Sequence, residues 1–311
     1  MKYGELFMMI EEIIQQKLRE VFQDENLIFD KSRFAGGLTN YNYIMKIDGN
    51  EYVIRQPGGM TNYMIDREVE KVNSTIATQL GLNSQCIYFD EVTGIKISKY
   101  IPNSKNIATA NPCDPANLSA VSSLMKKTHT SPVTFPNIFD FQTELSKYED
   151  IVEEMNGNFF FDYESLKEKL FDYMKTNLKN LVRIPCHNDT VPENFIVDEE
   201  GRMYLIDWEY AGLNDPSWDI AAYILESRLT GDAIEYLFLE YYGQFPKEEE
   251  LLKIKCFMLA QDLLWTVWAL IRHYNGDDFL DYCHIRYERF RKNMREILAS
   301  SDYTIADMVK S

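Results

Sequence analysis

Apolar residues in the first hundred positions follow helical spacing in some segments and strand-like spacing in others. The first 22 residues carry one apolar helical face, formed by Leu6, Met9, Ile10, Ile13, Ile14 and Leu18. Two β-like runs at 44–47 and 51–55 flank Asp48-Gly49-Asn50, which predicts a hairpin. A helix over about 66–80, closed by Gly81, and strands at 86–89 and 95–101 follow. This part is therefore predicted to be rich in strands.

The pattern changes after residues 102–117, a connector rich in Pro, Asn and Ala. Helical spacing dominates from there, over 117–129, 140–155, 162–179, 215–228, 230–242, 248–275 and 277–299. The exception is 184–207, where short β-like pieces carry polar residues. A β-rich lobe at 1–101 joined to a mainly helical lobe at 102–311 is an α+β, two-lobed architecture.

Composition and charge narrow the class of protein. The 311 residues are 45% hydrophobic and 26% charged, which is ordinary for a globular protein. We find no apolar run of the roughly 18 residues that a membrane span needs. Glu11, Glu12, Lys17 and Arg19 interrupt the apolar N-terminus, so we expect a cytoplasmic protein with no membrane partner. The net charge of −17 disfavours a nucleic-acid partner and favours cationic ligands.

A polar cluster lies between residues 187 and 207. His187-Asn188-Asp189 precedes Asn194, and two apolar runs around a Glu199-Glu200-Gly201 turn lead to Asp207. Two short strands around such a turn would bring Asp189, Asn194 and Asp207 together. Phosphoryl transfer needs a carboxylate that accepts the proton of the attacking hydroxyl, and oxygen ligands for Mg²⁺. We therefore predict Asp189 as the catalytic base and Asn194 and Asp207 as metal ligands. The alternative is a surface loop with ordinary turn residues.

This segment resembles the catalytic loop and metal-binding Asp of the aminoglycoside phosphotransferase and choline kinase branch of the protein-kinase-like fold. In that branch the motif HNDxxxxN is followed by IDWE or IDFE, and the order of features matches from about residue 27 to 299. The chain is more similar to the bacterial LicA-like choline kinases than to the eukaryotic ones, which carry Gln at the place of Val191. The resemblance implies a nucleotide-binding lobe at 1–101, a catalytic and substrate-binding lobe at 102–311, and ATP and Mg²⁺ as cofactors.

The resemblance also implies where the nucleotide binds. The turn Gly36-Gly37-Leu38-Thr39-Asn40 would cover the phosphates, because glycine lets backbone N–H groups approach them. Arg55 takes the strand position of the phosphate-binding Lys of protein kinases, and its guanidinium can pair with both phosphate and carboxylate. We expect Glu68 to be its partner, with Glu70 as the less favoured choice. The hinge that meets adenine would contain Ser98, Tyr100 and Ile101.

Three features point to the acceptor. Trp265 and Trp268 are three residues apart and share a helix face. A quaternary ammonium has no N–H to donate and is bound by aromatic faces, at about 0.5–2 kcal/mol each. The resemblance assigns both Trp residues, Tyr282 and Glu226 to choline, together with Asp189. Asp219, two helical turns before Glu226, would brace the catalytic loop. Alternatively the Trp pair is core and Glu226 a solvated charge.

Taken together, the residues and the resemblance predict a Mg²⁺- and ATP-dependent kinase that phosphorylates the hydroxyl of choline to phosphocholine. The nearest alternatives are kinases of ethanolamine, an aminoglycoside or methylthioribose. A catalytically inactive kinase-like binding protein is another alternative, disfavoured by the intact set of polar residues. A purely structural helical protein ranks last. The oligomeric state is left open.

Overall fold

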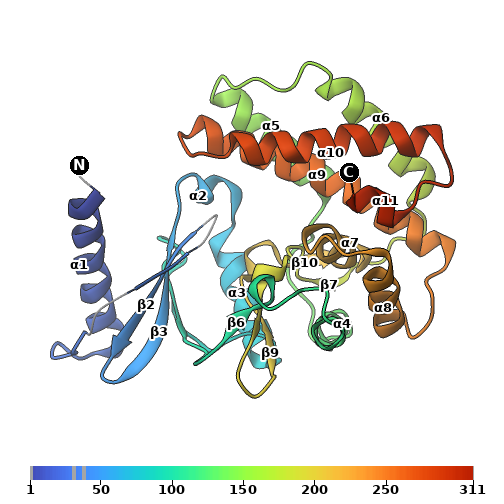
Figure 1. The fold of residues 1–311 in the computed structure, drawn as a ribbon. Coiled ribbons are helices and arrows are strands. Elements are labelled where there is room, and N and C mark those ends of the chain that lie inside the picture. Colours follow the sequence, from blue (N-terminus) through green and yellow to red (C-terminus); the bar gives the residue numbers. More distant parts are fainter. Residues whose placement is uncertain (1–2, 30–32, 37–39, 311) are drawn as a thin grey trace.

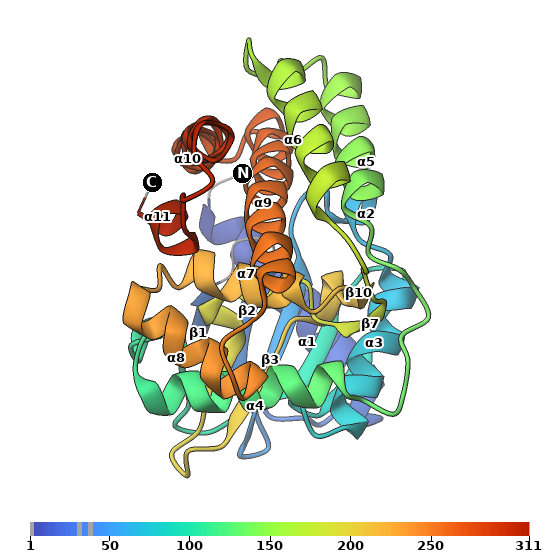
Figure 2. The same ribbon diagram turned by 90° about the vertical axis from the view of Figure 1, so that its right-hand side faces the viewer.

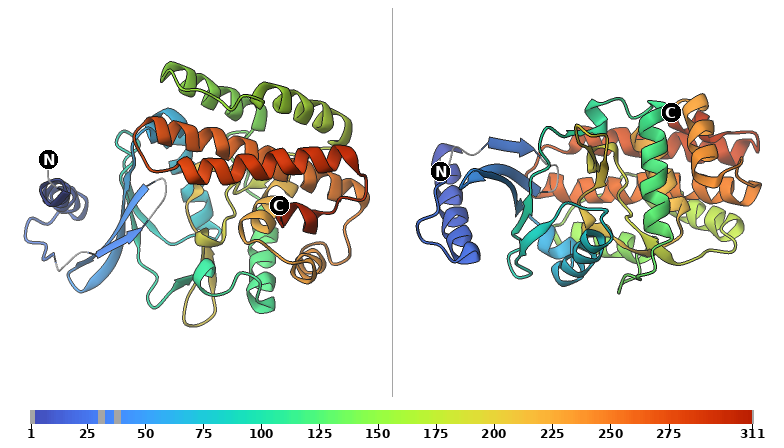
Figure 3. Two further views of the ribbon diagram at one scale, coloured as in Figure 1. Left: turned by 45° about the horizontal axis from the view of Figure 1, so that its top comes forward. Right: turned by 90° about the horizontal axis from the view of Figure 1, so that it is seen from below.

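The computed structural model describes residues 3–29, 33–36 and 40–310 of the chain. The larger sheet and the N-terminal helix lie at one end of the molecule, the C-terminal helices lie at the other, and short strands lie between them (Figures 1 and 3). The predicted α+β architecture is therefore present. The described residues form two hydrophobic clusters. A small one lies between the N-terminal helix and the N-terminal sheet, and a large one lies among the C-terminal helices.

In the described part of the chain, the first lobe contains a five-stranded antiparallel sheet in the order β1-β2-β3-β5-β4. The strands are β1 (Arg33–Gly36), β2 (Asn40–Ile47), β3 (Asn50–Pro57), β4 (Cys86–Phe89) and β5 (Lys96–Lys99). The predicted hairpin is confirmed, with β2 and β3 paired from Asn40↔Pro57 to Ile47↔Asn50. Asp48 and Gly49 close it with φ of 47° and 81°, a backbone region that glycine enters at little cost. Both strands are longer than predicted.

Helices cover both faces of this sheet. Helix α1 (Tyr3–Phe22) lies on the outer face, where Ile14 and Leu18 are buried together with Ile54 and Ile97 of the sheet (Figure 1). The short α2 (Thr61–Met64) leads into α3 (Arg67–Gln79), which lies between the sheet and the second lobe. Asp66 caps α3 by accepting hydrogen bonds from the N–H groups of residues 68 and 69.

The second lobe is helical. Its helices are α4 (Pro115–His129), α5 (Phe141–Glu154), α6 (Tyr163–Asn177), α7 (Ser217–Glu226), α8 (Gly231–Tyr242), α9 (Glu248–Tyr274), α10 (Leu280–Ala299) and α11 (Ile305–Val309). Helix α9 runs through the middle and contacts α5, α6, α7 and α10 (Figure 2). Contrary to the expectation that no apolar run reaches the length of a membrane span, α9 is long and apolar enough to cross a membrane, but 94% of its most apolar stretch is buried in the protein. Such burial is typical of a core helix, and the cytoplasmic location stays a prediction.

Short strands and turns fix the polar segment at 187–207 between the lobes. Strand β7 (Ile184–Cys186) pairs with β10 (Gly212–Asn214), and β8 (Phe195–Val197) pairs with β9 (Met203–Leu205) and with β6 (Lys105–Asn106). This region also contains three single 3₁₀ turns: η1 (Ile107–Thr109), η2 (Pro192–Asn194) and η3 (Trp208–Tyr210). Strand β6 lies in the predicted connector, where the sequence shows no strand pattern.

Candidate functional site

A single buried carboxylate anchors the loop that carries Asp189. Asp219, in the first turn of α7, accepts the backbone N–H groups of His187 at 2.9 Å and Asn188 at 2.7 Å. His129 of α4 contacts the same carboxylate through Nε2 at 2.9 Å, and Thr190 donates its hydroxyl to the Asp219 carbonyl at 2.6 Å. These contacts give Asp219 the bracing position expected from the sequence. They fix the backbone on both sides of Asp189.

The structure brings Asp189, Asn194 and Asp207 together. Asn194 donates its Nδ2 to the Asp189 carbonyl at 2.9 Å and to Asp189 Oδ2 at 3.0 Å. The β8–β9 ladder pairs Phe195 with Leu205, and the N–H of Ile206 donates to the Asn194 carbonyl at 2.9 Å. This backbone hydrogen bond ties the end of β9 to the start of β8 and sets Asp207 beside Asn194. Three residues that are separated in sequence therefore meet at one place between the lobes.

Two residues of this site have a left-handed backbone conformation. Asn188 has a φ of 66° and Asp207 a φ of 67°, both in the left-handed region. Asn188 is held there by its Nδ2, which donates to the Tyr210 carbonyl at 3.0 Å, and by Asn214, which donates to its Oδ1 at 2.9 Å. These hydrogen bonds hold Asn188 in a conformation that Asn and Asp enter more readily than other non-glycine residues.

Asp189 lies in an environment that disfavours its charge. Burial, followed by the charges of Asp207 and Glu209, raises the pKa of Asp189 from 3.8 to about 8, although the hydrogen bond from Asn194 opposes the shift. A carboxylate with a raised pKa holds a proton more readily than an ordinary aspartate does. The neighbouring His187 is buried, and its Nε2 contacts the Ile206 carbonyl at 2.9 Å. Its contacts are those of a residue that packs the loop.

The predicted partner of Arg55 is wrong. Glu68 is exposed, whereas Glu70 is fully buried and pairs with both terminal nitrogens of Arg55, with Nη2–Oε2 at 3.0 Å. Residues two apart on a helix differ by about 200° in direction, so only one of the two can face the sheet. Burial alone would raise the pKa of Glu70, but Arg55, Lys96 and Arg67 outweigh it and lower that pKa.

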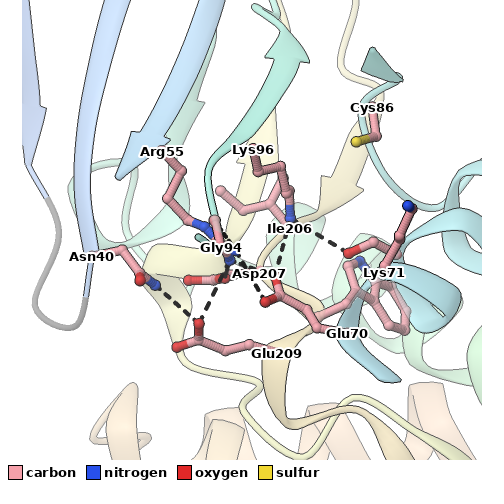
Figure 4. Close-up of polar contacts among 12 residues, drawn as sticks. Asn40, Arg55, Glu70, Lys71, Cys86, Gly94, Lys96, Ile206, Asp207 and Glu209 are labelled. Carbon is pink, nitrogen blue, oxygen red and sulfur yellow. Dashed lines mark hydrogen bonds and ion pairs between the residues drawn. The ribbon is translucent and has the colours of Figure 1, made fainter. Parts of the chain in front are cut away.

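A wider network of charges surrounds this pair (Figure 4). Arg67 Nη1 lies 2.6 Å from Glu70 and 3.2 Å from Glu209, and Lys96 Nζ lies 3.7 Å from Glu70. Arg55 also reaches Asp207 at 3.4 Å, which connects the sheet of the first lobe to the candidate metal ligand. Sequence reasoning missed Arg67, Lys96 and Glu209. The signal for Glu209 was present, because it is the last residue of the IDWE motif.

The start of β2 is also tied to this network. Asn40 is buried, and its Nδ2 donates to Glu209 Oε2 at 3.0 Å across the two lobes. Gly36 ends β1, while Gly37, Leu38 and Thr39 lie outside the described residues. The predicted phosphate-covering turn therefore begins and ends at strands, and its last residue contacts the segment that carries Asp207.

The predicted hinge lies at the end of β5. Ser98 is buried within this strand and pairs with Val53 of β3. Tyr100 follows the strand, donates its N–H to the Glu51 carbonyl at 3.2 Å, and has the Arg33 guanidinium over its ring at 5.4 Å. Ile101 is half-buried. These residues lead from the sheet into the second lobe, and their contact with adenine stays a prediction.

The residues at the cluster fit a magnesium ion. Asp207 has a side chain that is 29% exposed and carries carboxylate oxygens. Asn194 uses its Nδ2 for Asp189, so its Oδ1 is the atom left for a ligand role. Carboxylate and amide oxygens are the ligands that Mg²⁺ prefers. Oxygens of Glu70, Asp207 and Glu209 also lie within 4.8 Å of one another, but Glu70 is occupied by its three cationic neighbours.

The three aromatic residues predicted for the acceptor form one cluster in the second lobe. Both Trp residues are buried and belong to the hydrophobic core, as the alternative interpretation expects. The rings of Trp265 and Trp268 on α9 are 6.5 Å apart at 86°, and Trp268 is 6.1 Å from Tyr282 of α10. Trp268 also contacts Phe279 at 5.1 Å, and Trp265 contacts Tyr210 at 5.1 Å. Tyr210 and Phe279 were not predicted as members of this cluster. Tyr210 follows the IDWE motif directly, so the two candidate sites are adjacent.

Glu226 ends α7 beside this cluster and is buried in part. Its Oε2 accepts a 2.6 Å hydrogen bond from Arg286 Nη2, and its charge contributes to the raised pKa values of Asp189 and Tyr282. Glu226 therefore faces both the catalytic loop and the aromatic residues. The reading of Glu226 as a solvated charge is not supported, because its side chain is only 18% exposed.

Comparison with known proteins bears on this arrangement. The family model for choline/ethanolamine kinase matches residues 32–251. Protein LicA of Haemophilus influenzae is 32% identical over 272 residues, which cover 84% of this chain and 79% of that protein. Human ethanolamine kinase 1 is 25% identical over 315 residues, which cover 86% of this chain and 68% of that protein.

Solved structures agree with these relatives. The crystal structure of choline kinase LicA from Streptococcus pneumoniae matches with a TM-score of 0.81 and 31% identity, covering 92% of this chain and 99% of its own. A structure of LicA in complex with AMP has the same TM-score and identity and covers 92% and 98%. The predicted protein-kinase-like fold is thereby confirmed.

Proposed function

Because this chain belongs to the choline/ethanolamine kinase family, and is thus a nucleotide-dependent phosphotransferase, we propose that it transfers the γ-phosphoryl group of ATP to the hydroxyl of choline. The observation that carries the proposal is the meeting of Asp189, Asn194 and Asp207 beside a cluster of aromatic rings. The three polar residues supply the chemistry of phosphoryl transfer, and the aromatic rings supply faces that attract a quaternary ammonium.

Asp189 would orient the acceptor hydroxyl and take its proton. Asn194 holds Asp189 Oδ2 at 3.0 Å, so the other carboxylate oxygen, Oδ1, is left to meet the hydroxyl. Without Mg²⁺, burial and the charges of Asp207 and Glu209 raise the pKa of Asp189 to about 8. Mg²⁺ held by Asp207 would oppose these charges and favour the ionised carboxylate, which is the form that can accept the hydroxyl proton. Most of the rate acceleration would come from aligning the reactants and neutralising charge, and not from a covalent intermediate.

Asp207 and Asn194 would hold the magnesium ion, and Arg55 would steady the nucleotide phosphates. When bound, the ion supplies positive charge that neutralises the phosphate oxygens. Glu70 pairs with the Arg55 guanidinium at the end of the sheet and is itself held by Arg67 and Lys96. Asn40 and Glu209 would set the phosphate-covering turn against the segment that carries Asp207.

Ethanolamine is the second candidate acceptor. Among the described residues, Glu226 Oε1 is a buried carboxylate oxygen with no hydrogen-bond donor. An ammonium with N–H groups could donate to that oxygen, whereas choline could interact with it only through its charge. The aromatic rings favour choline, because a trimethylammonium group gains dispersion and cation–π attraction from several faces at once.

A panel of acceptors tests the proposal. The purified protein is assayed with ATP and Mg²⁺ against choline, ethanolamine, an aminoglycoside and methylthioribose, and kcat/KM is measured for each. We expect choline to be the best acceptor, with a kcat/KM at least about 10-fold above that of ethanolamine, which corresponds to about 1.4 kcal/mol. A kcat/KM for ethanolamine equal to or above that for choline would refute the choice of acceptor.

The two tryptophans provide a second test. Trp265→Ala and Trp268→Ala should each raise the KM for choline by about 2- to 30-fold, the equivalent of about 0.5–2 kcal/mol, and affect ethanolamine less. Trp265→Phe and Trp268→Phe are the matched controls, because they keep an aromatic face. Equal losses for both acceptors in the Ala variants would argue against a cage for a quaternary ammonium.

A further inference from the structure

A buried network of charges lies beneath the acceptor site and involves residues that the proposed reaction does not use. Arg286 of α10 is 5% exposed and bridges two acids on different helices. Its Nη2 lies 2.6 Å from Glu226 Oε2 on α7, and its Nη1 lies 3.3 Å from Asp262 Oδ1 on α9. Its guanidinium also lies 4.6 Å from the centre of the Tyr282 ring. Arg286 therefore touches two of the predicted acceptor residues.

Arg289, one turn further along α10, completes the network. It donates to Asp262 through Nε at 2.8 Å and through Nη2 at 2.5 Å. The same Nη2 lies 3.8 Å from Glu226 Oε1, which is beyond hydrogen-bonding distance. Arg286 and Arg289 thus balance the charges of Asp262 and Glu226. The two arginines differ in their acidic partners. Arg289 hydrogen-bonds Asp262 but not Glu226, whereas Arg286 contacts both acids and lies closer to Glu226.

This division leaves one oxygen of Glu226 available. Oε2 is occupied by Arg286, while Oε1 is buried and has no hydrogen-bond donor in the part of the chain that the structure describes. A buried carboxylate oxygen without a donor is costly. The cost would be offset in the acceptor complex if a cation approached this oxygen. Glu226 would then be shared between an internal guanidinium on Oε2 and the acceptor on Oε1.

We propose that Arg286 is a positioning residue of the acceptor site, which holds Glu226 by Oε2 and so presents Oε1 to the cationic head of the acceptor. The inference rests on the proposed function, since it assumes an acceptor with a cationic head at Glu226. It also assigns Arg286 a place against the Tyr282 ring, so that one guanidinium orders both the anionic and an aromatic part of the site.

The alternative is that Arg286 only ties α7, α9 and α10 together. The two cases differ in what removal of the guanidinium does. Without Arg286, Glu226 would either take up a proton or turn to Arg289, whose Nη2 is already 3.8 Å from Oε1. Either change withdraws Oε1 from the acceptor. A purely structural role would lower stability and leave the KM of the folded enzyme for its acceptor unchanged.

The test compares Arg286→Met and Arg286→Lys with Arg289→Met in the full chain. Arg289 is the matched control, because it is a largely buried guanidinium on the same helix that bonds Asp262 and lies too far from Glu226 for a hydrogen bond. KM and kcat are measured for choline and ethanolamine and for MgATP, alongside Tm. We expect Arg286→Met to raise the acceptor KM at least about 10-fold with the MgATP KM within about 2-fold, whereas Arg289→Met lowers Tm with little change in acceptor KM.

Arg286→Lys keeps the charge but has one nitrogen in place of a fork, so its acceptor KM should fall between those of the wild type and Arg286→Met. This variant keeps the inference testable if the Met variant does not fold. Acceptor KM values within about 2-fold of wild type in both Arg286 variants, or an equal rise in Arg289→Met, would overturn it. The wild-type enzyme distinguishes the two failures: no activity on choline or ethanolamine refutes the proposed function, whereas normal wild-type activity with unchanged variants refutes only the role of Arg286.

Discussion

Replacing Glu70 by glutamine perturbs the most heavily paired carboxylate of the first lobe. Glu70 is fully buried and faces Arg55, Arg67 and Lys96. Glutamine has nearly the same size and shape but no charge, so three buried cations would lose their shared anion. Glu68, two residues away on the same helix, is exposed. Glu68→Gln is therefore a control with the same chemical change.

The expected size of the effect follows from burial. Breaking a buried ion pair by removing one partner costs about 3–5 kcal/mol, because the remaining charge is left uncompensated. In Glu70→Gln, Arg55 would still have Asp207 and Arg67 would still have Glu209 as an acidic neighbour. We therefore expect the free energy of unfolding to fall by the lower end of this range, about 3 kcal/mol. An exposed charge changes stability by less than about 0.5 kcal/mol, which is our expectation for Glu68→Gln. Arg55 should also lose its fixed position, raising the KM for MgATP.

The assay is urea unfolding of both variants at pH 7, with the KM for MgATP measured on the folded proteins. The sign of the pH dependence gives an independent check. The pKa of Glu70 is lowered by its cationic neighbours, so its contribution is present at neutral pH and is lost as the pH falls below 4.5. The difference between wild type and Glu70→Gln should therefore shrink in acid. A loss of unfolding free energy below about 1 kcal/mol at pH 7, or equal losses in the two variants, would show that Glu70 does not compensate the buried cations.

Two further predictions concern the cluster at 187–207. Asp207→Asn should raise the Mg²⁺ concentration needed for half-maximal activity by at least about 10-fold, the loss typical when a metal site is weakened; an unchanged requirement would show that Asp207 is not a ligand. Asp189 has a pKa of about 8 in the folded protein against an ordinary 3.8, so between these pH values the folded state holds a proton that the unfolded state lacks, and stability falls as the pH rises. Without Mg²⁺, the Tm of Asp189→Asn should therefore fall less than the Tm of wild type when the pH is raised from about 5.5 to 8.5. An identical fall in both proteins would contradict the raised pKa.

The sequence predicted the elements of this fold well where one periodicity dominates. The helix over 66–80 is α3, with Asp66 as its cap, and the hairpin around Asp48-Gly49-Asn50 is present. The order of polar residues in the segment at 187–207 located the site because two short strands and a turn fix their separation. Strand β6 was missed, since two residues paired with a distant strand leave no local pattern.

The partner of Arg55 was missed for a physical reason. Sequence reasoning assumes that the apolar face of a helix is the buried one, but the buried face of α3 carries Arg67, Glu70, Asn73 and Ser74. Val72, which is apolar, is 45% exposed. The spacing of the polar residues, at 67, 70, 73 and 74, is itself helical. It is the signal that could have selected Glu70 over Glu68.

The charges beneath the acceptor site were beyond sequence reasoning as well. Asp262, Arg286 and Arg289 lie on two helices whose relative rotation is set by packing in the core. The spacing of the two arginines on α10 is ordinary for an exposed charged stripe. Only the tertiary structure shows that both arginines turn inward to two acids.

The role of Asp189 as the base is tested most directly by the rate of phosphoryl transfer in Asp189→Asn, measured with saturating MgATP and the best acceptor of the panel, together with the affinity for MgATP. Asparagine keeps the size of the side chain but cannot accept the proton. We expect kcat to fall by about 10²–10⁴-fold, with the Kd for MgATP within about 3-fold of the wild type. A kcat within about 10-fold of the wild type would contradict this role, because the group proposed to receive the proton would then be dispensable.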